Sequence, residues 1–171
     1  GLLRASRELV DSGLVRAVGL CNCSTEHARV ALRILGDRLV AVQNHFSLWA
    51  RQAEKPAPRP PVAKSNKAGM LAFCEAHGLI FMPHGAMGGH AARNGRRDLA
   101  KDCPALSALA RTKDCSEHAL VLSWMRHRHP CIVHIPGVRS QKHVLDLANS
   151  AHIRLTEAEA KLIDQIKPNT A

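Results

Sequence analysis

The stretch LVRAVGLCNCS, residues 14–24, combines a short apolar run with a polar turn and a serine suited to capping a helix. Its first seven residues, Leu14 to Leu20, predict a buried strand because apolar side chains occupy both faces of the run. Ser24 then begins a helical pattern that Gly36 ends, since serine favours the N-cap and glycine the C-terminal stop. This segment therefore predicts a strand followed directly by a helix.

The same order of strand and helix recurs along the rest of the chain. Three further apolar runs predict buried strands, at residues 39–42 (LVAV), 79–82 (LIFM) and 131–135 (CIVHI). Helical patterns lie between and after these runs, at residues 65–77, at residues 116–128 and beyond residue 156. Thr156 and Glu159 have the spacing of a capping box, which predicts the start of the last helix. Apolar runs alternating with helices indicate a parallel sheet covered by helices.

Two segments interrupt this rhythm and predict long loops. Residues 54–64 (EKPAPRPPVAK) contain too many prolines for a helix, and residues 85–97 are rich in glycine and basic side chains. Each segment follows a predicted strand. In folds built from βα units, the loops after the carboxyl ends of the strands form the functional face, so we expect the site there. Trp49, in the same region, could line a cleft or cover the rim.

Four consecutive βα units are compatible with half of a (β/α)8 barrel and also with a doubly wound open sheet. A nucleotide-binding open sheet usually carries GxGxxG or a P-loop after a strand, and this chain has neither motif there. The run GAMGG at residues 85–89 is not a P-loop because no Gly-Lys-Ser/Thr follows it. We therefore favour an α/β fold that forms a partial TIM (β/α)8 barrel, with residues 1–171 as a single domain.

Composition and charge restrict the class of protein. Of the 171 residues, 46% are hydrophobic, which suits a globular core, and the apolar runs are too short to cross a bilayer. No leader pattern opens the chain, so we expect a cytoplasmic protein without a membrane partner. The net charge of +10 could suit nucleic acid, but the basic residues are dispersed and only 3% of residues are aromatic. We therefore expect no nucleic-acid partner, and instead a solvated basic face or a phosphate-bearing small ligand.

Cysteine and histidine do not form a metal pattern in the sequence. The six cysteines are scattered without a CxxC pair, so we interpret them as reduced thiols and expect no metal. Cys21 and Cys23 would point to opposite faces of a strand. His127, His129 and His134 suggest a metal hypothesis, but interleaved arginines repel a cation. A basic cluster near the end of a helix is the interpretation that we favour.

Four segments resemble a known family in its order and spacing. They are GLCNCS (19–24), VAVQNHFSL (40–48), IFMPHGAMGG (80–89) and IVHIPGVRSQKHVLDLANSAHIRLTEAEAKLID (132–164). They resemble the ends of the fifth to eighth barrel strands of the aldo-keto reductases, together with the closing helix. The resemblance implies a partial barrel made of C-terminal βα units only, and a chain that is a fragment of a whole reductase.

The resemblance implies contacts with a nicotinamide cofactor. Asn22 and Gln43 match the side chains that hydrogen-bond the nicotinamide carboxamide, a task that suits amides because they both donate and accept. Cys21 stands beside Asn22 where the family usually has serine. His84 stands where the family usually has a tyrosine stacked on the nicotinamide ring. Without the resemblance, Asn22 could simply cap a turn, and Gln43 could simply satisfy buried backbone groups.

Two further segments match the parts of the family that meet the phosphates and adenosine. The loop over the pyrophosphate is matched by Gly85, Met87 and Gly88. The turn at the adenosine 2′-phosphate is matched by Gly137, Arg139 and Ser140, and the adenine end by His143 and Asp146. A guanidinium binds phosphate through two parallel hydrogen bonds, so Arg139 favours NADP(H) over NAD(H) as the cofactor.

The family's catalytic groups are missing from the chain. Aldo-keto reductases take an Asp, a Tyr, a Lys and a His from the first four strands, and this chain has no tyrosine. The resemblance therefore implies an NADP(H)-dependent oxidoreductase that is inactive alone and has no catalytic residue here. A non-catalytic nucleotide-binding or regulatory half-barrel module is the alternative. Because a half barrel exposes strand edges, we expect pairing with a missing N-terminal half or a second copy, and a small-molecule carbonyl substrate only in the completed barrel.

Overall fold

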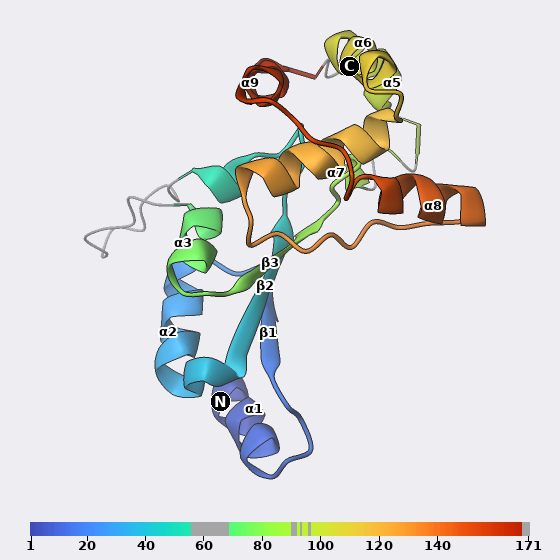
Figure 1. Ribbon diagram of the computed structural model, residues 1–171. Coiled ribbons are helices and arrows are strands. Elements are labelled where there is room, and N and C mark those ends of the chain that lie inside the picture. The colour runs from blue at the N-terminus through green and yellow to red at the C-terminus, as the bar shows by residue number, and fades with distance from the viewer. Residues whose placement is uncertain (56–68, 90–91, 93, 96, 169–171) are drawn as a thin grey trace.

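The computed structural model describes residues 1–55, 69–89, 92, 94–95 and 97–168. Its named strands form one parallel sheet in chain order (Figure 1). They are β1 (Val18–Cys21), β2 (Leu39–His45) and β3 (Ile80–His84). Each overlaps a predicted apolar run, so the expected alternation of parallel strands and helices is confirmed for these three units.

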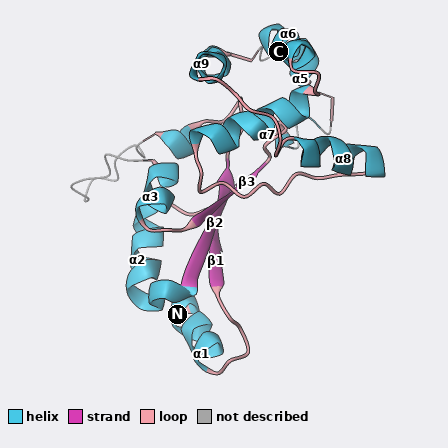
Figure 2. Cartoon of the chain, viewed as in Figure 1, coloured by secondary structure: helices cyan, strands magenta, loops and turns pink. Residues whose placement is uncertain are grey.

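Helices flank the strands along the chain (Figure 2). α1 (Leu2–Asp11) precedes β1, while α2 (Thr25–Leu35) and α3 (Met70–Ala76) follow β1 and β2. The helices after β3 are α5 (Leu99–Asp102), α6 (Pro104–Thr112), α7 (Glu117–Arg128), α8 (Gln141–Asn149) and α9 (Glu157–Gln165). The short 3-10 turns η1 (Gly36–Arg38) and η2 (Gln52–Glu54) lie before and after β2. In the described part of the chain, no helix is long and apolar enough to span a membrane.

Local signals begin two of these helices where the sequence predicts them. Ser24 Oγ accepts the N–H of His27 at 3.2 Å and caps α2. Thr156 and Glu159 form the capping box of α9 through contacts of 2.8 and 3.2 Å. α3 begins at Met70, within the predicted 65–77, but residues 65–68 lie outside the described residues. So does most of the loop predicted at residues 54–64.

The helices α5 and α6 are an addition to the predicted elements, although each carries a start signal. Asp98 accepts the N–H of Lys101 at 3.0 Å and caps α5. Pro104 stands in the first turn of α6, where a missing N–H costs nothing. Both signals are visible in the sequence, but these helices follow the glycine-rich segment instead of an apolar run. Within that segment, residues 90, 91, 93 and 96 lie outside the described residues.

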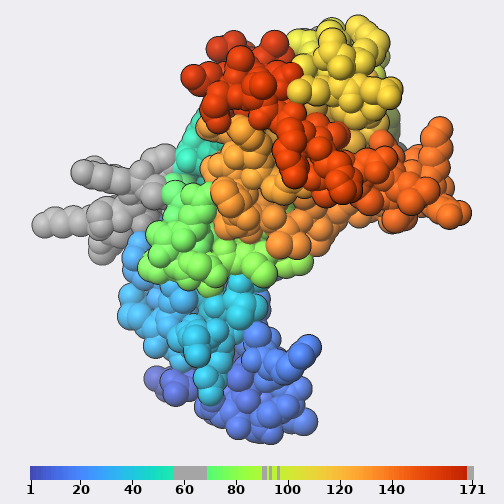
Figure 3. Space-filling model, viewed as in Figure 1, coloured from blue at the N-terminus to red at the C-terminus, as the bar shows by residue number. Residues whose placement is uncertain are grey.

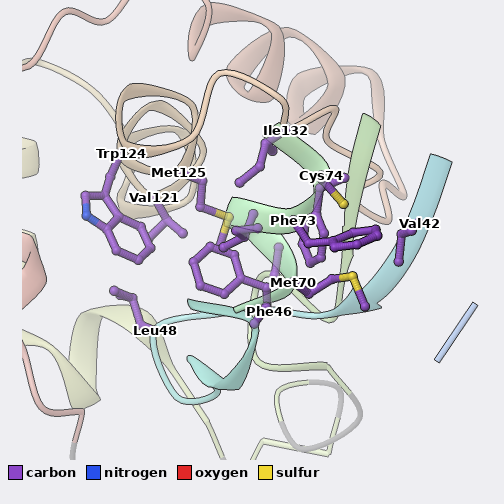
Figure 4. Close-up of a cluster of buried hydrophobic side chains, with 14 of the residues drawn as sticks. Val42, Phe46, Leu48, Met70, Phe73, Cys74, Val121, Trp124, Met125 and Ile132 are labelled. Carbon is purple, nitrogen blue, oxygen red and sulfur yellow. The ribbon is translucent and has the colours of Figure 1, made fainter. Parts of the chain in front are cut away.

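The core lies between one face of the sheet and the helices that cover it. Val42 and Phe81 are fully buried there, and Phe46 stacks on Trp124 of α7 with 5.9 Å between ring centroids. Figure 4 shows Phe46, Met70 and Trp124 among the side chains that converge from α3, from α7 and from the residues that follow β2. Removing such a side chain from water contributes about 1.5–3 kcal/mol, so this cluster stabilises the strand ends near the site.

Burial of both strand faces, which the apolar runs predict, is wrong. On the face opposite Val42 and Phe81, Ile80 is 40% exposed and Cys21 is exposed. Successive side chains of a strand point to opposite faces, and the described helices cover only one of them. β1 also begins at Val18, later than Leu14, and Leu14 is 78% exposed.

The strand predicted at residues 131–135 is also corrected, because it is reduced to one parallel bridge between Phe81 and Ile132. The bridge has two hydrogen bonds, from Phe81 N to Cys131 O at 2.9 Å and from Val133 N to Phe81 O at 3.0 Å. The next bond of a parallel ladder would need the N–H of Pro83, and proline has none. Pairing therefore stops there, and Val133 is 48% exposed.

Candidate functional site

The carboxyl ends of the three strands bring together the residues expected around a nicotinamide. The register pairs Cys21 with Gln43, and His45 with His84. Asn22 follows β1 directly and donates its backbone N–H to Gln43 O at 2.9 Å. Since the pairs share the less covered face of the sheet, their side chains border the same space.

Asn22 adopts a left-handed backbone conformation, with φ 51°. Asparagine tolerates this conformation better than most residues, so the turn after β1 suits it. Its Oδ1 lies 2.8 Å from Nε2 of His84. Beside it, Cys21 Sγ lies 3.5 Å from Gln43 Oε1. The side chains of β1 and its turn are therefore hydrogen-bonded to those of β2 and β3.

His84 and His45 stack, with ring centroids 5.3 Å apart and planes inclined by 11°. Gly85, with φ 69°, makes this stack possible, because a Cβ at that position would lie 2.9 Å from the His45 ring. Burial lowers the pKa of His45, and the nearby His84 and Arg97 lower it further. His45 is therefore neutral at physiological pH, which removes the charge repulsion that would oppose the stack.

A cavity of about 650 Å³ continues from His84 along the molecule. Most of its lining comes from two segments distant in the sequence, within residues 84–89 and 135–147, and Ala92 and His118 complete it. The orange and red segment that includes α8 projects from the molecule (Figure 3). Seven of the predicted cofactor residues are in its wall: His84, Gly85, Met87, Gly137, Arg139, His143 and Asp146. Its volume is within the range of small-molecule and cofactor sites.

At the end of this cavity near α8, which we call its outer end, most of the titratable side chains are basic. Arg139, His143 and His118 line it, and Asp146, the one acidic side chain among the described residues of its wall, accepts a hydrogen bond from Ser116 Oγ at 2.6 Å. That bond ties α8 to the N-terminus of α7. Ser140, which does not line the cavity, caps α8 by accepting the N–H of His143 at 3.2 Å. Sequence reasoning missed His118, since nothing in its spacing separates it from other helix histidines.

Two hydrogen bonds and a cation–π contact hold the loop after β3 in place. Gly88 donates its N–H to Gly85 O at 2.9 Å, and its own carbonyl accepts from Arg97 at 3.2 Å. The Arg97 guanidinium lies over the Trp49 ring, 5.4 Å from its centroid. Gly88 therefore holds the loop shape without lining the cavity, and Trp49 supports the loop instead of lining either cavity formed by described residues.

A second cavity, of about 400 Å³, adjoins the ends of β1 and β2. Asn22 lines it together with Cys23, Asn44 and His45. Asn44 fixes the chain there, accepting the N–H of Cys23 at 3.0 Å and donating to its carbonyl at 2.7 Å. The hydrogen bond between Asn22 and His84 thus joins the two cavities, since each partner lines one of them. Cys21 and Gln43 line neither.

The histidines of the basic cluster predicted near the end of α7 contact different partners. His127 Nε2 contacts Glu157 at 3.0 Å, whereas His129 Nδ1 contacts Glu75 at 3.1 Å. Burial lowers the pKa of His134 to about 4. The three histidines therefore do not act as one group, and two of them are bound by carboxylates instead of relying on the helix dipole. Among the described residues, no group of three His, Cys, Asp or Glu side chains could hold a metal.

Comparison with known proteins shows the family of the chain. The model of the aldo/keto reductase family matches residues 2–168. The chain belongs to this family. It is 30% identical over 160 residues to an uncharacterized oxidoreductase of Schizosaccharomyces pombe. The matched region covers 93% of this chain and 45% of that protein. It is 24% identical over 168 residues to aldo-keto reductase family 1 member A1 of Xenopus tropicalis, covering 97% of this chain and 46% of that one.

Solved structures show the same likeness of fold. The aldose reductase of Giardia lamblia superposes with a TM-score of 0.74 at 21% identity, over 96% of this chain and 48% of that one. A thermostable aldo-keto reductase solved with the inhibitor epalrestat superposes with a TM-score of 0.71 at 23% identity, over 95% and 52%. The α/β fold is therefore similar to that of the aldo-keto reductase barrels. The chain spans about half the length of the relatives it matches.

Proposed function

We propose that this chain is the C-terminal part of an aldo-keto reductase barrel, strands five to eight, and provides the NADP(H) site of a carbonyl–alcohol oxidoreductase. The observation that supports this most is the cavity of about 650 Å³, which joins His84 and its loop to the segment carrying Arg139. A pyridine ring would lie near Asn22, Gln43 and His84, and a phosphate would lie near Arg139. An elongated dinucleotide fits a cavity that extends from His84, which is hydrogen-bonded to Asn22, to Arg139.

The basic outer end favours NADP(H) over NAD(H). Arg139 offers a guanidinium that can bind a phosphate through two hydrogen bonds, and His118 and His143 stand in the same wall. Asp146 is turned to Ser116 by their 2.6 Å hydrogen bond. A 2′-phosphate would therefore meet donors more readily than it meets the carboxylate.

The chemistry is divided between this chain and strands outside it. NADPH, when bound, supplies the hydride that reduces a carbonyl carbon, and a proton must reach the carbonyl oxygen. The chain has no tyrosine to give that proton. His45 is a poor proton donor at neutral pH because its pKa is lowered. The described residues thus bind and orient the cofactor, and turnover of a small carbonyl substrate needs a further segment.

The exposed sheet face suggests how such a segment would attach. Cys21, Gln43 and Ile80 lie on the face that the described helices leave uncovered. In a barrel this face is interior and the outer strands have neighbours. We propose that a missing N-terminal half, or a second copy of this chain, pairs with it. A nucleotide-binding or regulatory module without catalysis is the second candidate, and the absence of tyrosine favours it for the chain alone.

The test is calorimetric titration of the chain with NADPH and with NADH. We expect NADPH to bind more tightly, and the Arg139→Ala variant to lose about tenfold or more because a charge-assisted phosphate contact contributes about 1.5–3 kcal/mol. Lys142→Ala is the matched control, since Lys142 is an exposed basic residue close to Arg139 in the sequence, in the first turn of α8, and does not line the cavity. Absence of binding by a folded chain, or equal losses in the two variants, contradicts the proposal.

Turnover separates the two candidates. The chain alone should not oxidise NADPH in the presence of small aldehydes. Adding a separately produced N-terminal half of a related reductase should restore oxidation if the chain is an enzyme part. If the cofactor binds and no added half restores turnover, the non-catalytic module is the better description.

A further inference from the structure

Residues 134–149, which we call the arm, form one wall of the cavity of about 650 Å³ and include Arg139 and α8 (Figure 1). All residues of the arm are described, and none of them is buried. Within the described part of the chain, one hydrogen bond joins the arm to a distant segment, from Ser116 Oγ to Asp146 at 2.6 Å. Segments with so few buried contacts open locally before the whole fold unfolds.

His134 stands at the base of the arm. It directly follows the last hydrogen bond to β3, from Val133 N to Phe81 O at 3.0 Å. Both of its ring nitrogens are buried, and neither has a hydrogen-bond partner among the described residues. A protonated ring in this position would enclose a charge and two donors without acceptors, which costs far more free energy than enclosing the neutral ring. The closed arm therefore favours neutral His134.

The groups of α7 next to His134 act on its charge in opposite directions. Burial lowers its pKa from 6.5 to about 4; the carbonyl of Leu122 opposes this change, and the like charge of Arg126 adds to it. The carbonyl does not have the geometry of a hydrogen bond to either ring nitrogen. Arg126 is held in place, because its guanidinium donates to the carbonyls of Ser150 at 2.8 Å and Ala151 at 3.2 Å. The arm therefore closes beside a fixed positive charge.

The other titratable groups of the adjoining elements have positions of their own. Asp146, the acidic side chain of the arm, is turned to Ser116. His143 lines the cavity, and Lys142 beside it is exposed. On β3 the titratable side chain is His84, whose Nε2 lies 2.8 Å from Asn22 Oδ1. No carboxylate of α8 or β3 is thus hydrogen-bonded to His134 to compensate a charge on it.

We propose that protonation of His134 releases the arm from α7 and opens the wall of the cavity that carries Arg139. The charged imidazole regains water and moves away from Arg126 when the arm opens. The core around Phe46 and Trp124 lies outside the arm and stays folded. Opening does not depend on which ligand occupies the cavity, so this inference goes beyond the proposed function and does not rest on it.

The size of the effect follows from the two pKa values of this histidine. His134 titrates at about 4 in the closed arm and at 6.5 once it is exposed. Because the pKa in the closed arm is the lower one, closure is fully stable above pH 6.5 and loses stability as the pH falls towards about 4. The equilibrium constant for opening should therefore be about 30-fold larger at about pH 5 than at about pH 8.

The measurement is amide hydrogen exchange of the full chain by mass spectrometry at these two pH values, corrected for the intrinsic exchange rate at each. We expect the protection factors of α8 to be about 30-fold lower at the acidic pH. Urea well below the unfolding midpoint should change them little, because local opening exposes little surface. In His134→Leu the protection factors of α8 should be nearly equal at both pH values, since leucine binds no proton.

A second variant and a control make the outcome decisive. His134→Gln is polar and uncharged, so it should remove the pH dependence even if leucine disturbs the packing. His152→Leu, at an exposed histidine just beyond the arm, should keep the full dependence. Protection of α8 that does not change with pH in the unaltered protein overturns the inference, as does a fall that persists in both His134 variants. A fall with the strong urea dependence of global unfolding also overturns it, because acid would then unfold the whole chain.

Discussion

Glu54 lies in a cluster of charges that joins η2 to the end of α7. Its carboxylate contacts Arg51 at 2.7 and 2.8 Å and lies 3.5 Å from Nε2 of His129, with 17% of its side chain exposed. Burial alone would raise its pKa, but contacts with His129 and Arg51 outweigh burial and lower the pKa from 4.5 to about 2. We predict that this carboxylate is a main source of acid sensitivity in the fold.

The magnitude follows from the difference between the folded and ordinary pKa. A pKa of about 2 instead of 4.5 corresponds to about 3 kcal/mol of stability near neutral pH, at about 1.4 kcal/mol per pH unit. Because the folded-state pKa is the lower one, this stability is complete above the ordinary pKa. It is lost as the pH falls from 4.5 towards about 2.

The perturbation is Glu54→Gln, measured by urea denaturation followed by circular dichroism. Near neutral pH we expect the free energy of unfolding to fall by about 2–3 kcal/mol, and at about pH 3 the difference between the proteins should shrink to about half. Glu26→Gln is the control, because Glu26 contacts Arg29 at 3.9 Å and is 47% exposed; such a surface pair should contribute less than about 1 kcal/mol. Equal effects at both pH values, or an effect no larger than that of Glu26→Gln, would refute the reasoning.

Three further changes probe the loop, the helix start and the basic side of the same cluster. Gly85→Ala should destabilise the fold by about 1–3 kcal/mol in thermal unfolding, and by more than Gly36→Ala, because both have positive φ but only the Cβ at residue 85 would meet His45. Ser116→Ala should cost about 1 kcal/mol and speed amide hydrogen exchange in the first turn of α7, since Ser116 caps that helix; unchanged exchange there would contradict this. Burial alone would lower the pKa of His129, but its contacts with Glu54 and Glu75 raise that pKa above 6.5. The protonated imidazole therefore stabilises the fold fully below pH 6.5, and this stabilisation is lost as the pH rises through the pKa of His129 in the folded protein. Unfolding titrations should show that loss in the unaltered protein and a flat profile in His129→Gln.

The sequence alone was sufficient for features that depend on neighbours along the chain. Ser24 and Thr156 predict their helices because a cap is made with residues only three positions away. The apolar runs around β2 and β3 predict strands because a buried strand shows its pattern over a few residues. The order of these units, together with the strand ends, was enough for the family.

Other features depended on partners that the sequence does not name. The predicted last strand ends at one bridge because Pro83, some fifty residues earlier, cannot donate the next hydrogen bond. The exposed face of the sheet likewise depends on which helices cover it, and an apolar run cannot report that. Both predictions were wrong because the pattern within one strand does not show which strand pairs with it or which helix covers it.

For the candidate site, the sequence placed Asn22, Gln43 and His84 at strand ends, and the carboxyl ends of parallel strands share one edge. It could not show that His84 binds Asn22, that His45 stacks on His84, or that Asp146 turns to Ser116. Those contacts depend on strand register and on the angle between helices, which tertiary packing sets. A residue's type and its position in an element are local properties. The partner of each polar atom is decided by side chains that only the folded chain brings within hydrogen-bonding distance.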